Sequence, residues 1–354
     1  MGFIRTLLAL VVVMGHIPGA PVLVGGRNAV QMFYVISGFL MSYVLVERLS
    51  YRSTKAFYVN RYLRLYPIYL AVIALTFMSC LAFATRPQLW EVYQQAPWSA
   101  SVWLVLSNLL MVGQDWIMFA GVHADQLVFS MNFRESDVAL WQGLLAPQAW
   151  TLGVELSFYV IAPFILGRRS WLWMLLVLSL VLRLYLIKIG VGMNDPWDYR
   201  FFPTEVALFV SGALVHQVMR PVYARYLDAS LQYRCGLWAC AMLLLAILFY
   251  SSIPLPALLK SAALFALFLP CLPLIFVVQS QSRLDRAVGE LSYPIYIGHW
   301  LVIETVQGVL TDQSDTLLLM VCVISATLAF AYALNRWIGT PVERWRDRLR
   351  SKSA

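Results

Sequence analysis

The amino-acid sequence predicts an all-α fold, a polytopic bundle of helices in a membrane. Of its 354 residues, 61% are hydrophobic and only 12% are charged, whereas about 25% of the residues of an average soluble domain are charged. The mean hydropathy is +0.72, and the apolar residues fall into runs close to the ~20 residues that a helix needs to cross a bilayer. Because a bundle in lipid can continue through a whole chain as one unit, we expect a single membrane domain over residues 1–354.

Ten apolar runs are predicted to span the membrane. They are residues 5–24, 29–47, 63–84, 148–166, 171–189, 201–219, 236–253, 257–279, 291–311 and 316–338. A further run, 101–113, is too short for a crossing and is predicted to re-enter the membrane or to lie at its interface. It belongs to residues 85–147, which are predicted to form a long external loop. The basic residues 339–354 are predicted to form a solvated cytoplasmic tail.

The basic residues predict the orientation of these spans. With ten spans and a cytoplasmic N-terminus, nineteen of the 26 Lys and Arg residues fall in inner segments and four in outer loops. This distribution follows the positive-inside bias. If 101–113 were counted as a span, Arg168 and Arg169 would lie on the outer side, against that bias. We therefore expect a multi-pass protein of the inner (cytoplasmic) membrane with both termini in the cytoplasm. The net charge of +8 then indicates contact with membrane lipid and requires no nucleic acid.

The cysteines do not indicate a metal site or a disulfide framework. None of the five forms a CxxC pair, and all lie in or beside apolar runs. They are interpreted as small buried hydrophobic residues. We expect no metal ion and no tightly bound cofactor.

The first apolar run, "RTLLALVVVMGHIPG", contains two ionisable side chains. Arg5 and His16 are eleven residues apart, so on one helix they share a face ~16 Å apart in depth. Burying an imidazole in hydrocarbon costs free energy, which makes an intramembrane histidine a candidate for function. The alternative is a packed histidine that is hydrogen-bonded to a neighbouring helix.

A second histidine lies at a similar depth. In "LSYPIYIGHW", His299 is predicted ~12 Å from the cytoplasmic end of its span, close to the ~16 Å predicted for His16. Two imidazoles at one level fit a shared polar pocket, although the sequence does not say whether their helices touch.

Two arginines mark the start of the third span. Arg61 and Arg64 in "NRYLRLYP" are spaced i, i+3, so both are predicted to point from one face at the cytoplasmic mouth. Guanidinium forks match phosphate oxygens, which suits a cytosolic ligand with several phosphates. The alternative is that they only anchor the helix at lipid headgroups.

A carboxylate lies inside the fourth span. Glu155 in "AWTLGVELSFYVIAP" is predicted ~10 Å from the external face, where it must be protonated, paired or in a wet cavity. It is a candidate for orienting an imidazole or for bonding a sugar hydroxyl. The alternative is a structural partner for Arg183.

Three weaker candidates complete the predicted site. Ser37 precedes Gly38 in the second span, where small residues commonly mark close helix packing. Arg200 and Glu205 lie at the outer end of the sixth span. They are predicted to face the exterior, as contacts for a polar acceptor or as an interfacial ion pair.

Taken together, these stretches resemble the acyltransferase-3 family of integral-membrane acyl-CoA-dependent O-acyltransferases. The resemblance covers nearly the whole chain. It rests on Arg5 and His16, "FYVISGF" in the second span, Arg61 and Arg64, "WTLGVELSFY" in the fourth span, and "LSYPIYIGHW". It implies transfer of an acyl group, most often acetyl, from cytosolic acyl-CoA to a carbohydrate hydroxyl on the far side of the membrane.

The resemblance also implies roles for individual residues. His16 matches the essential histidine of the family, and Arg5, Arg61 and Arg64 match the arginines associated with acyl-CoA. His16 is expected to act as a general base or as a transient acyl carrier, with Glu155 and His299 beside it. Some relatives carry an added extracellular hydrolase-like domain. This chain is expected to complete the transfer itself or to pass the acyl group to a separate extracytoplasmic partner protein.

A different class of function remains open on the residues alone. A proton-coupled secondary transporter or a glycolipid exporter would use His16, Glu155 and His299 as a proton relay. No inverted repeat or pair of broken helices supports it. A structural membrane scaffold would leave the aligned polar residues without a role. The sequence leaves the acceptor and the acyl group undetermined.

Overall fold

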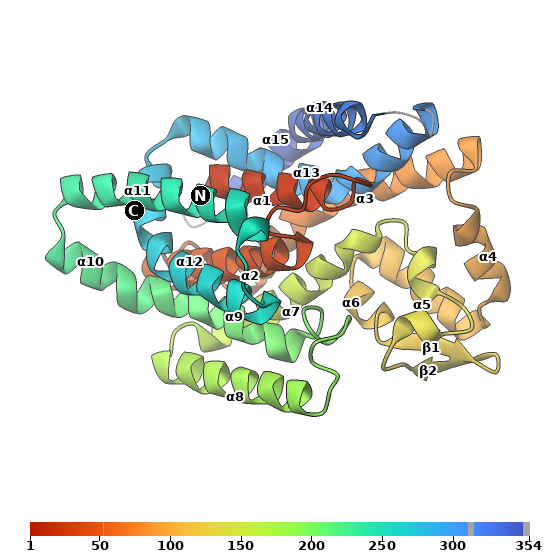
Figure 1. The fold of residues 1–354 in the computed structure, drawn as a ribbon, viewed down its shortest axis with the longest axis horizontal. Coiled ribbons are helices and arrows are strands. Elements are labelled where there is room, and N and C mark those ends of the chain that lie inside the picture. The colour runs from red at the N-terminus through yellow and green to blue at the C-terminus, as the bar shows by residue number, and fades with distance from the viewer. Residues whose placement is uncertain (52, 311–314, 350–354) are drawn as a thin grey trace.

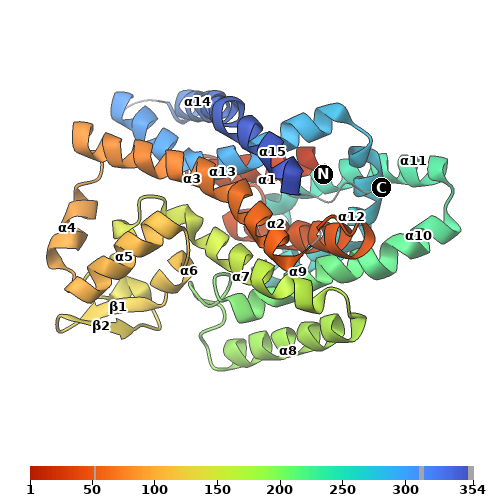
Figure 2. The same cartoon turned by 180° about the vertical axis from the view of Figure 1, so that it is seen from behind.

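The computed structural model describes residues 1–51, 53–310 and 315–349 as a bundle of long helices with one small lobe (Figure 1 and Figure 2). The helices run lengthwise beside one another. The lobe, formed by the segment between α3 and α7, lies beside one end of the bundle and holds two short strands. This arrangement confirms the predicted all-α, polytopic fold.

Within the described residues, seven helices are long and apolar enough to cross a membrane, and they coincide with seven of the predicted spans. They comprise α2 (Gly26–Ser42) with the π-turn η1 (Tyr43–Glu47), α3 (Thr54–Phe83), α8 (Arg169–Lys188), α9 (Phe202–Leu214) with η5 (Val215–Met219) and α10 (Arg220–Tyr226), α11 (Ala229–Phe249) with η6 (Tyr250–Ser252), α12 (Ala257–Ser280), and α14 (Thr316–Leu334) with η7 (Asn335–Gly339) and α15 (Thr340–Arg346).

The other three predicted spans correspond to helices that are shorter or more polar. They are α1 (Gly2–Met14), α7 (Trp150–Ile165) and α13 (Arg283–Val309). The prediction of one helix over residues 5–24 is wrong, because α1 ends at Met14. Pro18 cannot continue a helix, and Gly19 adopts a φ of 75° that only glycine tolerates freely. Residue 311, the end of the predicted span 291–311, lies outside the described residues.

The lobe contains the apolar run that is too short to span. Its elements are α4 (Pro87–Gln95), α5 (Trp98–Leu110), α6 (Gln114–Ile117), the antiparallel pair β1 (Ala120–His123) and β2 (Gln126–Phe129), and the turns η2 (Phe133–Glu135), η3 (Leu140–Gly143) and η4 (Pro147–Ala149). The predicted run 101–113 corresponds to α5.

The end of α5 is tied to the middle of α3. The hydroxyls of Tyr62, Tyr66 and Tyr69 donate to the carbonyls of Leu110, Leu109 and Asn108 at 3.1, 3.0 and 2.7 Å. These are carbonyls that the end of a helix leaves without a partner. Because α5 reaches this far along a spanning helix, its place agrees with the re-entrant alternative.

Two glycine contacts fix the centre of the bundle. A Cβ on Gly38 of α2 would lie 1.8 Å from the carbonyl oxygen of Phe209, and one on Gly212 of α9 would lie 1.9 Å from that of Val35. The backbones of α2 and α9 therefore touch, as the Ser37–Gly38 pair predicts. Close approach through small residues is typical of helices packed in membranes.

Helix α1 is joined in the same way to α13. The backbone N–H groups of Gly2 and Phe3 donate to the carboxylate of Asp285, each at 2.7 Å. These groups have no partner within α1, so a carboxylate from α13 caps its start. Gly2 also lies against Gly289 of α13. The helix that leads to His16 is thus fixed to the helix that carries His299.

The C-terminal residues are more ordered than a solvated tail. Residues 340–346 form α15, and Arg346 is 4% exposed. Its Nε donates to the backbone carbonyl of Asn60 at 3.1 Å, which holds α15 against α3. This stretch of the predicted tail is therefore helical and is packed against α3 through Arg346, while Trp345 beside it is 52% exposed. Residues 350–354 lie outside the described residues.

Candidate active site

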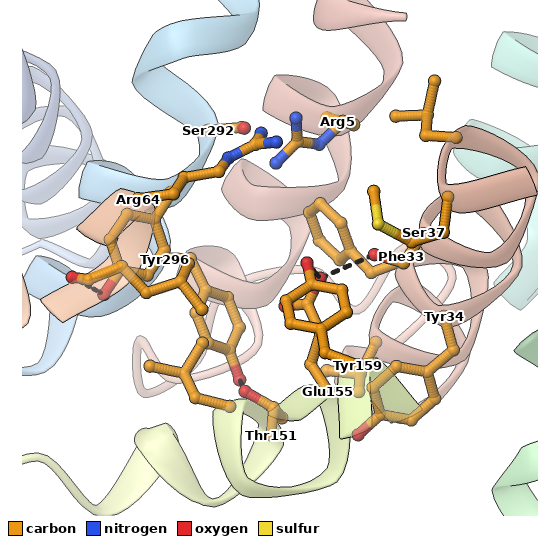
Figure 3. Close-up of a pocket in the computed structure, with 16 residues that line it drawn as sticks. Arg5, Phe33, Tyr34, Ser37, Arg64, Thr151, Glu155, Tyr159, Ser292 and Tyr296 are labelled. Atoms are coloured by element: carbon orange, nitrogen blue, oxygen red, sulfur yellow. Dashed lines mark hydrogen bonds between the residues drawn. The ribbon is translucent and has the colours of Figure 1, made fainter. Parts of the chain in front are cut away.

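Two arginines face one another inside the bundle. Arg5 of α1 and Arg64 of α3 line a cavity of about 60 Å³, here called the arginine cavity, and their guanidinium groups point toward each other at one end of it (Figure 3). Neither makes a hydrogen bond or an ion pair with another described residue. Two unpaired guanidinium groups side by side repel each other, so the arrangement favours an anion between them.

The same arginines open onto two larger cavities. One, of about 260 Å³, lies between α3, α13 and α15, and the other, of about 220 Å³, lies between α1 and the start of α13. Arg5 and Arg64 line both. The arginine pair therefore stands where a ligand from this end of the bundle would enter the arginine cavity.

Glu155 lies in the arginine cavity together with Ser37. The Ser37 hydroxyl donates to Glu155 Oε1 at 2.7 Å, and the Tyr159 hydroxyl donates to the same oxygen. The structure therefore brings Ser37 and Glu155 together near the arginines. Glu155 does not line the cavity that holds His16, where we expected it to approach the acceptor. It is also not the partner of Arg183, which pairs with Glu205.

His16 lies in a second cavity, of about 340 Å³, here called the histidine cavity. It follows the end of α1, and its Nδ1 lies 2.8 Å from the carbonyl oxygen of Val12. Because a carbonyl only accepts, Nδ1 carries the proton and the lone pair of Nε2 is available. The side chain is exposed to this cavity. Because α1 ends before His16, the ring lies in an open hollow and is not packed inside a helix bundle.

His299 lies directly beside His16. The two ring centroids are 5.0 Å apart, so the predicted meeting of the imidazoles is confirmed. His299 Nδ1 donates to the carbonyl of Tyr296 at 2.5 Å. The ring is fully buried, and its Nε2 has no partner among the described residues. Both rings thus keep Nε2 as a potential proton acceptor.

Arg200 and Trp150 form another wall of the histidine cavity. The Arg200 guanidinium lies 4.3 Å from the centre of the Trp150 ring and is held by Asp195 at 2.5 Å. Burial acts to lower the pKa of Arg200, but Tyr199 and Asp195 raise it above the ordinary value of an arginine. This side chain therefore stays charged beside the cavity.

Glu205 does not reach the exterior. It is fully buried, pairs with Arg183 and accepts hydrogen bonds from Gln31 at 3.2 and 3.3 Å. Its predicted place beside Arg200 facing the acceptor is wrong. The reason is that Arg183, predicted near the outer face of the preceding span, turns inward and takes Glu205 as its counter-ion.

Arg61 and Arg64 open into different cavities. Arg61 is 4% exposed, donates to the Tyr51 hydroxyl at 2.7 Å and lies over the rings of Phe57 and Tyr159. It lines a cavity between α3, α6 and α7. The predicted common direction is therefore not realised. Residues at i, i+3 differ by about 60° around a helix, which is enough for aromatic neighbours to separate them.

Tyr296 is a site residue that the sequence did not single out. It lines both the arginine cavity and the histidine cavity. Its hydroxyl donates to the carbonyl of Gln148 at 3.1 Å and accepts from Thr151 at 2.9 Å. Helical spacing offered a signal, since Ser292, Tyr296 and His299 lie at i, i+4 and i+7 on one face of α13.

No cluster of metal-binding side chains accompanies these residues. Among residues 1–51, 53–310 and 315–349, no three His, Cys, Asp or Glu side chains are placed to hold an ion.

Comparison with known proteins assigns the family. The family model described as an acyltransferase domain, acyltransferase-3, matches residues 1–336. The chain belongs to the acyltransferase-3 family. The predicted family and the predicted class of enzyme, an acyltransferase, are confirmed.

Two curated relatives of this acyltransferase-3 protein are similar over much of their length. Peptidoglycan O-acetyltransferase OatA of Listeria monocytogenes is 24% identical over 348 residues, which cover 90% of this chain and 52% of the relative. An uncharacterized protein of Aquifex aeolicus is 25% identical over 213 residues, 57% of this chain and 90% of the relative. The chain thus spans about half the length of the Listeria protein. No solved structure matches.

Proposed function

We propose that this protein is a membrane O-acetyltransferase that moves an acetyl group from cytosolic acetyl-CoA to a hydroxyl of a cell-wall carbohydrate outside. Membership of the family and similarity to a peptidoglycan O-acetyltransferase support the reaction class. One observation carries the proposal. A pair of unpaired arginines and a histidine with a free Nε2 occupy two cavities that meet at Tyr296.

The basic end of the bundle is assigned to the cytoplasm. Arg48 follows the end of the α2–η1 helix, where Glu47 pairs with Arg220, and basic residues accumulate on the cytoplasmic side of membrane proteins. Both termini are then cytoplasmic and the lobe is external. In a bacterium this membrane is the inner one.

Arg5 and Arg64 would bind the phosphates of acetyl-CoA. A guanidinium offers two parallel donors to phosphate oxygens, and neither of these arginines has a competing protein partner. The pantetheine arm would then pass Glu155 and present the thioester near Tyr296. Arg61, already bonded to Tyr51, would act by placing its neighbours.

His16 would take the proton of the acceptor hydroxyl on Nε2. The hydroxyl oxygen forms a bond to the acyl carbon, the carbon–sulfur bond breaks, and the leaving thiolate receives a proton from the imidazolium. In the alternative order, Nε2 itself bonds to the acyl carbon, the carbon–sulfur bond breaks and the thiolate leaves. The sugar hydroxyl oxygen then bonds to the acyl carbon, the carbon–nitrogen bond breaks, and the hydroxyl proton neutralises the thiolate. Both orders need the lone pair that the Val12 hydrogen bond leaves free.

The sugar would lie against Trp150 and Arg200 in the histidine cavity. Aromatic faces bind the apolar face of a sugar, and a charged guanidinium donates to its oxygens. The cavity volume of about 340 Å³ is within the size range of sites for small ligands.

Transfer by the purified protein tests the proposal. The protein in lipid nanodiscs, with labelled acetyl-CoA and muropeptides, is expected to form the sugar ester. His16→Ala is expected to lower the rate by about 10²–10⁴-fold, the usual contribution of a general base. A fully active His16→Ala protein would reject the role of His16. Absence of ester from wild type with every glycan tested, in a protein that carries protons across vesicles, would favour a transporter instead.

A further inference from the structure

The arginine cavity and the histidine cavity meet at two side chains. Val30 and Tyr296 are the described residues that line both. Figure 3 shows the hydroxyl of Tyr296 at Thr151, away from the end where the arginines lie. Tyr296 is 8% exposed, so its side chain is closely packed where the two cavities meet.

Tyr296 is held in this position from several directions. Its hydroxyl is fixed by the start of α7, where Gln148 accepts at 3.1 Å and Thr151 donates at 2.9 Å. The ring of Phe33 packs edge to face against it, with centroids 6.2 Å apart. Its carbonyl accepts the hydrogen bond that orients His299.

We infer that the ring of Tyr296 is a partition that keeps water of the histidine cavity from the thioester of the bound donor, while the acyl group itself passes beside the ring to meet His16 and the sugar hydroxyl. This inference rests on the proposed function. The histidine cavity is open and has a volume of about 340 Å³, enough for several waters. The arginine cavity, of about 60 Å³, has room for few waters. Tyr296 is thus a positioning residue that favours transfer over hydrolysis.

The competing reaction is loss of the acyl group to water. A water oxygen bonds to the acyl carbon, the carbon–sulfur bond breaks, and the thiolate takes a proton released by that water, which gives acetate and free CoA. His16 would take a proton from water as readily as from a sugar hydroxyl. Hydrolysis of the thioester is therefore prevented only if water is excluded from it.

The ratio of acetate release to ester formation tests the partition. Tyr296→Ala is expected to raise this ratio at least about 10-fold, because water then reaches the thioester. Tyr296→Phe keeps the ring and is expected to stay within about 3-fold of wild type. Tyr296→Leu provides a second truncation if the alanine variant does not fold. Tyr223→Ala, a tyrosine truncation on α10 outside both cavities, is the matched control.

An unchanged ratio in Tyr296→Ala and Tyr296→Leu, or equal loss of both reactions, would overturn the inference while leaving the proposed function in place. A wild-type protein that forms no ester would reject the proposed function instead.

Chemical labelling tests the partition without any enzyme assay. Ser37→Cys places a thiol in the arginine cavity of a chain whose five cysteines are changed to alanine. A small anionic methanethiosulfonate, added on the side of the lobe, is expected to react at least about 10-fold faster when Tyr296→Ala is also present. Equal rates with tyrosine and alanine at position 296 would overturn the inference.

Discussion

The two imidazoles differ in exposure although they share one hydrogen-bonding pattern. Each donates from Nδ1 to a helix carbonyl, three or four residues earlier in the chain. His16 faces the open cavity, while His299 is sealed behind it. A buried ring next to the proposed base His16 is suited to keep that base neutral and in place, because a second charge there would be costly.

We expect His299→Gln to slow transfer by about 10–100-fold without weakening the donor-induced rise in melting temperature. Glutamine retains a hydrogen-bonding group but cannot act as an imidazole. Steady-state kinetics and thermal unfolding of the same preparation measure both quantities. Unchanged kinetics would show that His299 only fills space.

Asp115 in the lobe gives a pH dependence of stability. Burial raises the pKa of Asp115 to about 6, although its own backbone N–H and that of Trp116 act to lower it. The folded protein therefore holds the proton more tightly than the unfolded chain does, and stability falls as pH rises from about 4 to 6.

Asp115→Asn is expected to remove this fall. Wild type and variant should be equally stable near pH 4. Above pH 7 the variant should be more stable by at most about 3 kcal/mol, which is the free energy that corresponds to a pKa shift of about two units. Thermal unfolding from pH 4 to 8 measures the difference. Parallel curves for the two proteins would contradict the assigned ionisation.

At the scale of helices, apolar length predicts the spanning elements well and helix ends poorly. Seven predicted spans match helices because their apolar runs are uninterrupted. The prediction of one helix over 5–24 failed because Gly15, Pro18 and Gly19 are as apolar as a spanning sequence requires, although α1 ends before them. Membrane helices tolerate such residues when neighbours satisfy the backbone, so only the packing of the bundle decides.

Because the backbones of α2 and α9 touch at Gly38, the free energy of unfolding is expected to depend strongly on keeping glycine at this position. Gly38→Ala would bring a methyl group within 1.8 Å of the Phe209 carbonyl oxygen, so the helices must separate. We expect a loss of about 1–3 kcal/mol or more in the free energy of unfolding. Gly308→Ala, in α13 with no atom within 4 Å of the added carbon, is the control. It should be neutral or slightly stabilising, by up to about 1 kcal/mol. Equal effects of the two changes would contradict the packing.

At the scale of the molecule, cavities from the basic end converge on the arginine pair. Arg5→Ala combined with Arg64→Ala should abolish the rise in melting temperature caused by acetyl-CoA, which for a ligand at 100 times its Kd corresponds to about 2.7 kcal/mol. Arg225→Ala removes a charge on α10, away from these cavities, and should retain the rise. A full rise in the double variant would place the donor elsewhere.

The sequence identified most side chains of the site but not their grouping. His16 with His299, and Ser37 with Glu155, come together because their depths in the membrane agree. Glu205 and Arg61 were misplaced because their partners, Arg183 and Tyr51, lie in the neighbouring segments outside their own helices, and how those segments fold back is not visible in the local pattern. Tyr296 was missed because its only signal was helical spacing with Ser292 and His299, which an aromatic residue that merely packs in an apolar span would show as well.

The capping of α1 by Asp285 has a consequence for motion. That carboxylate and the Gly2–Gly289 contact bind the start of α1 to α13, so the two helices form one stiff frame. His299 lies on α13, and His16 follows directly after α1. Other helices can tilt to admit a bulky glycan without stretching the gap between the rings. The rest of the bundle can therefore move while the distance between the His16 and His299 rings stays constant.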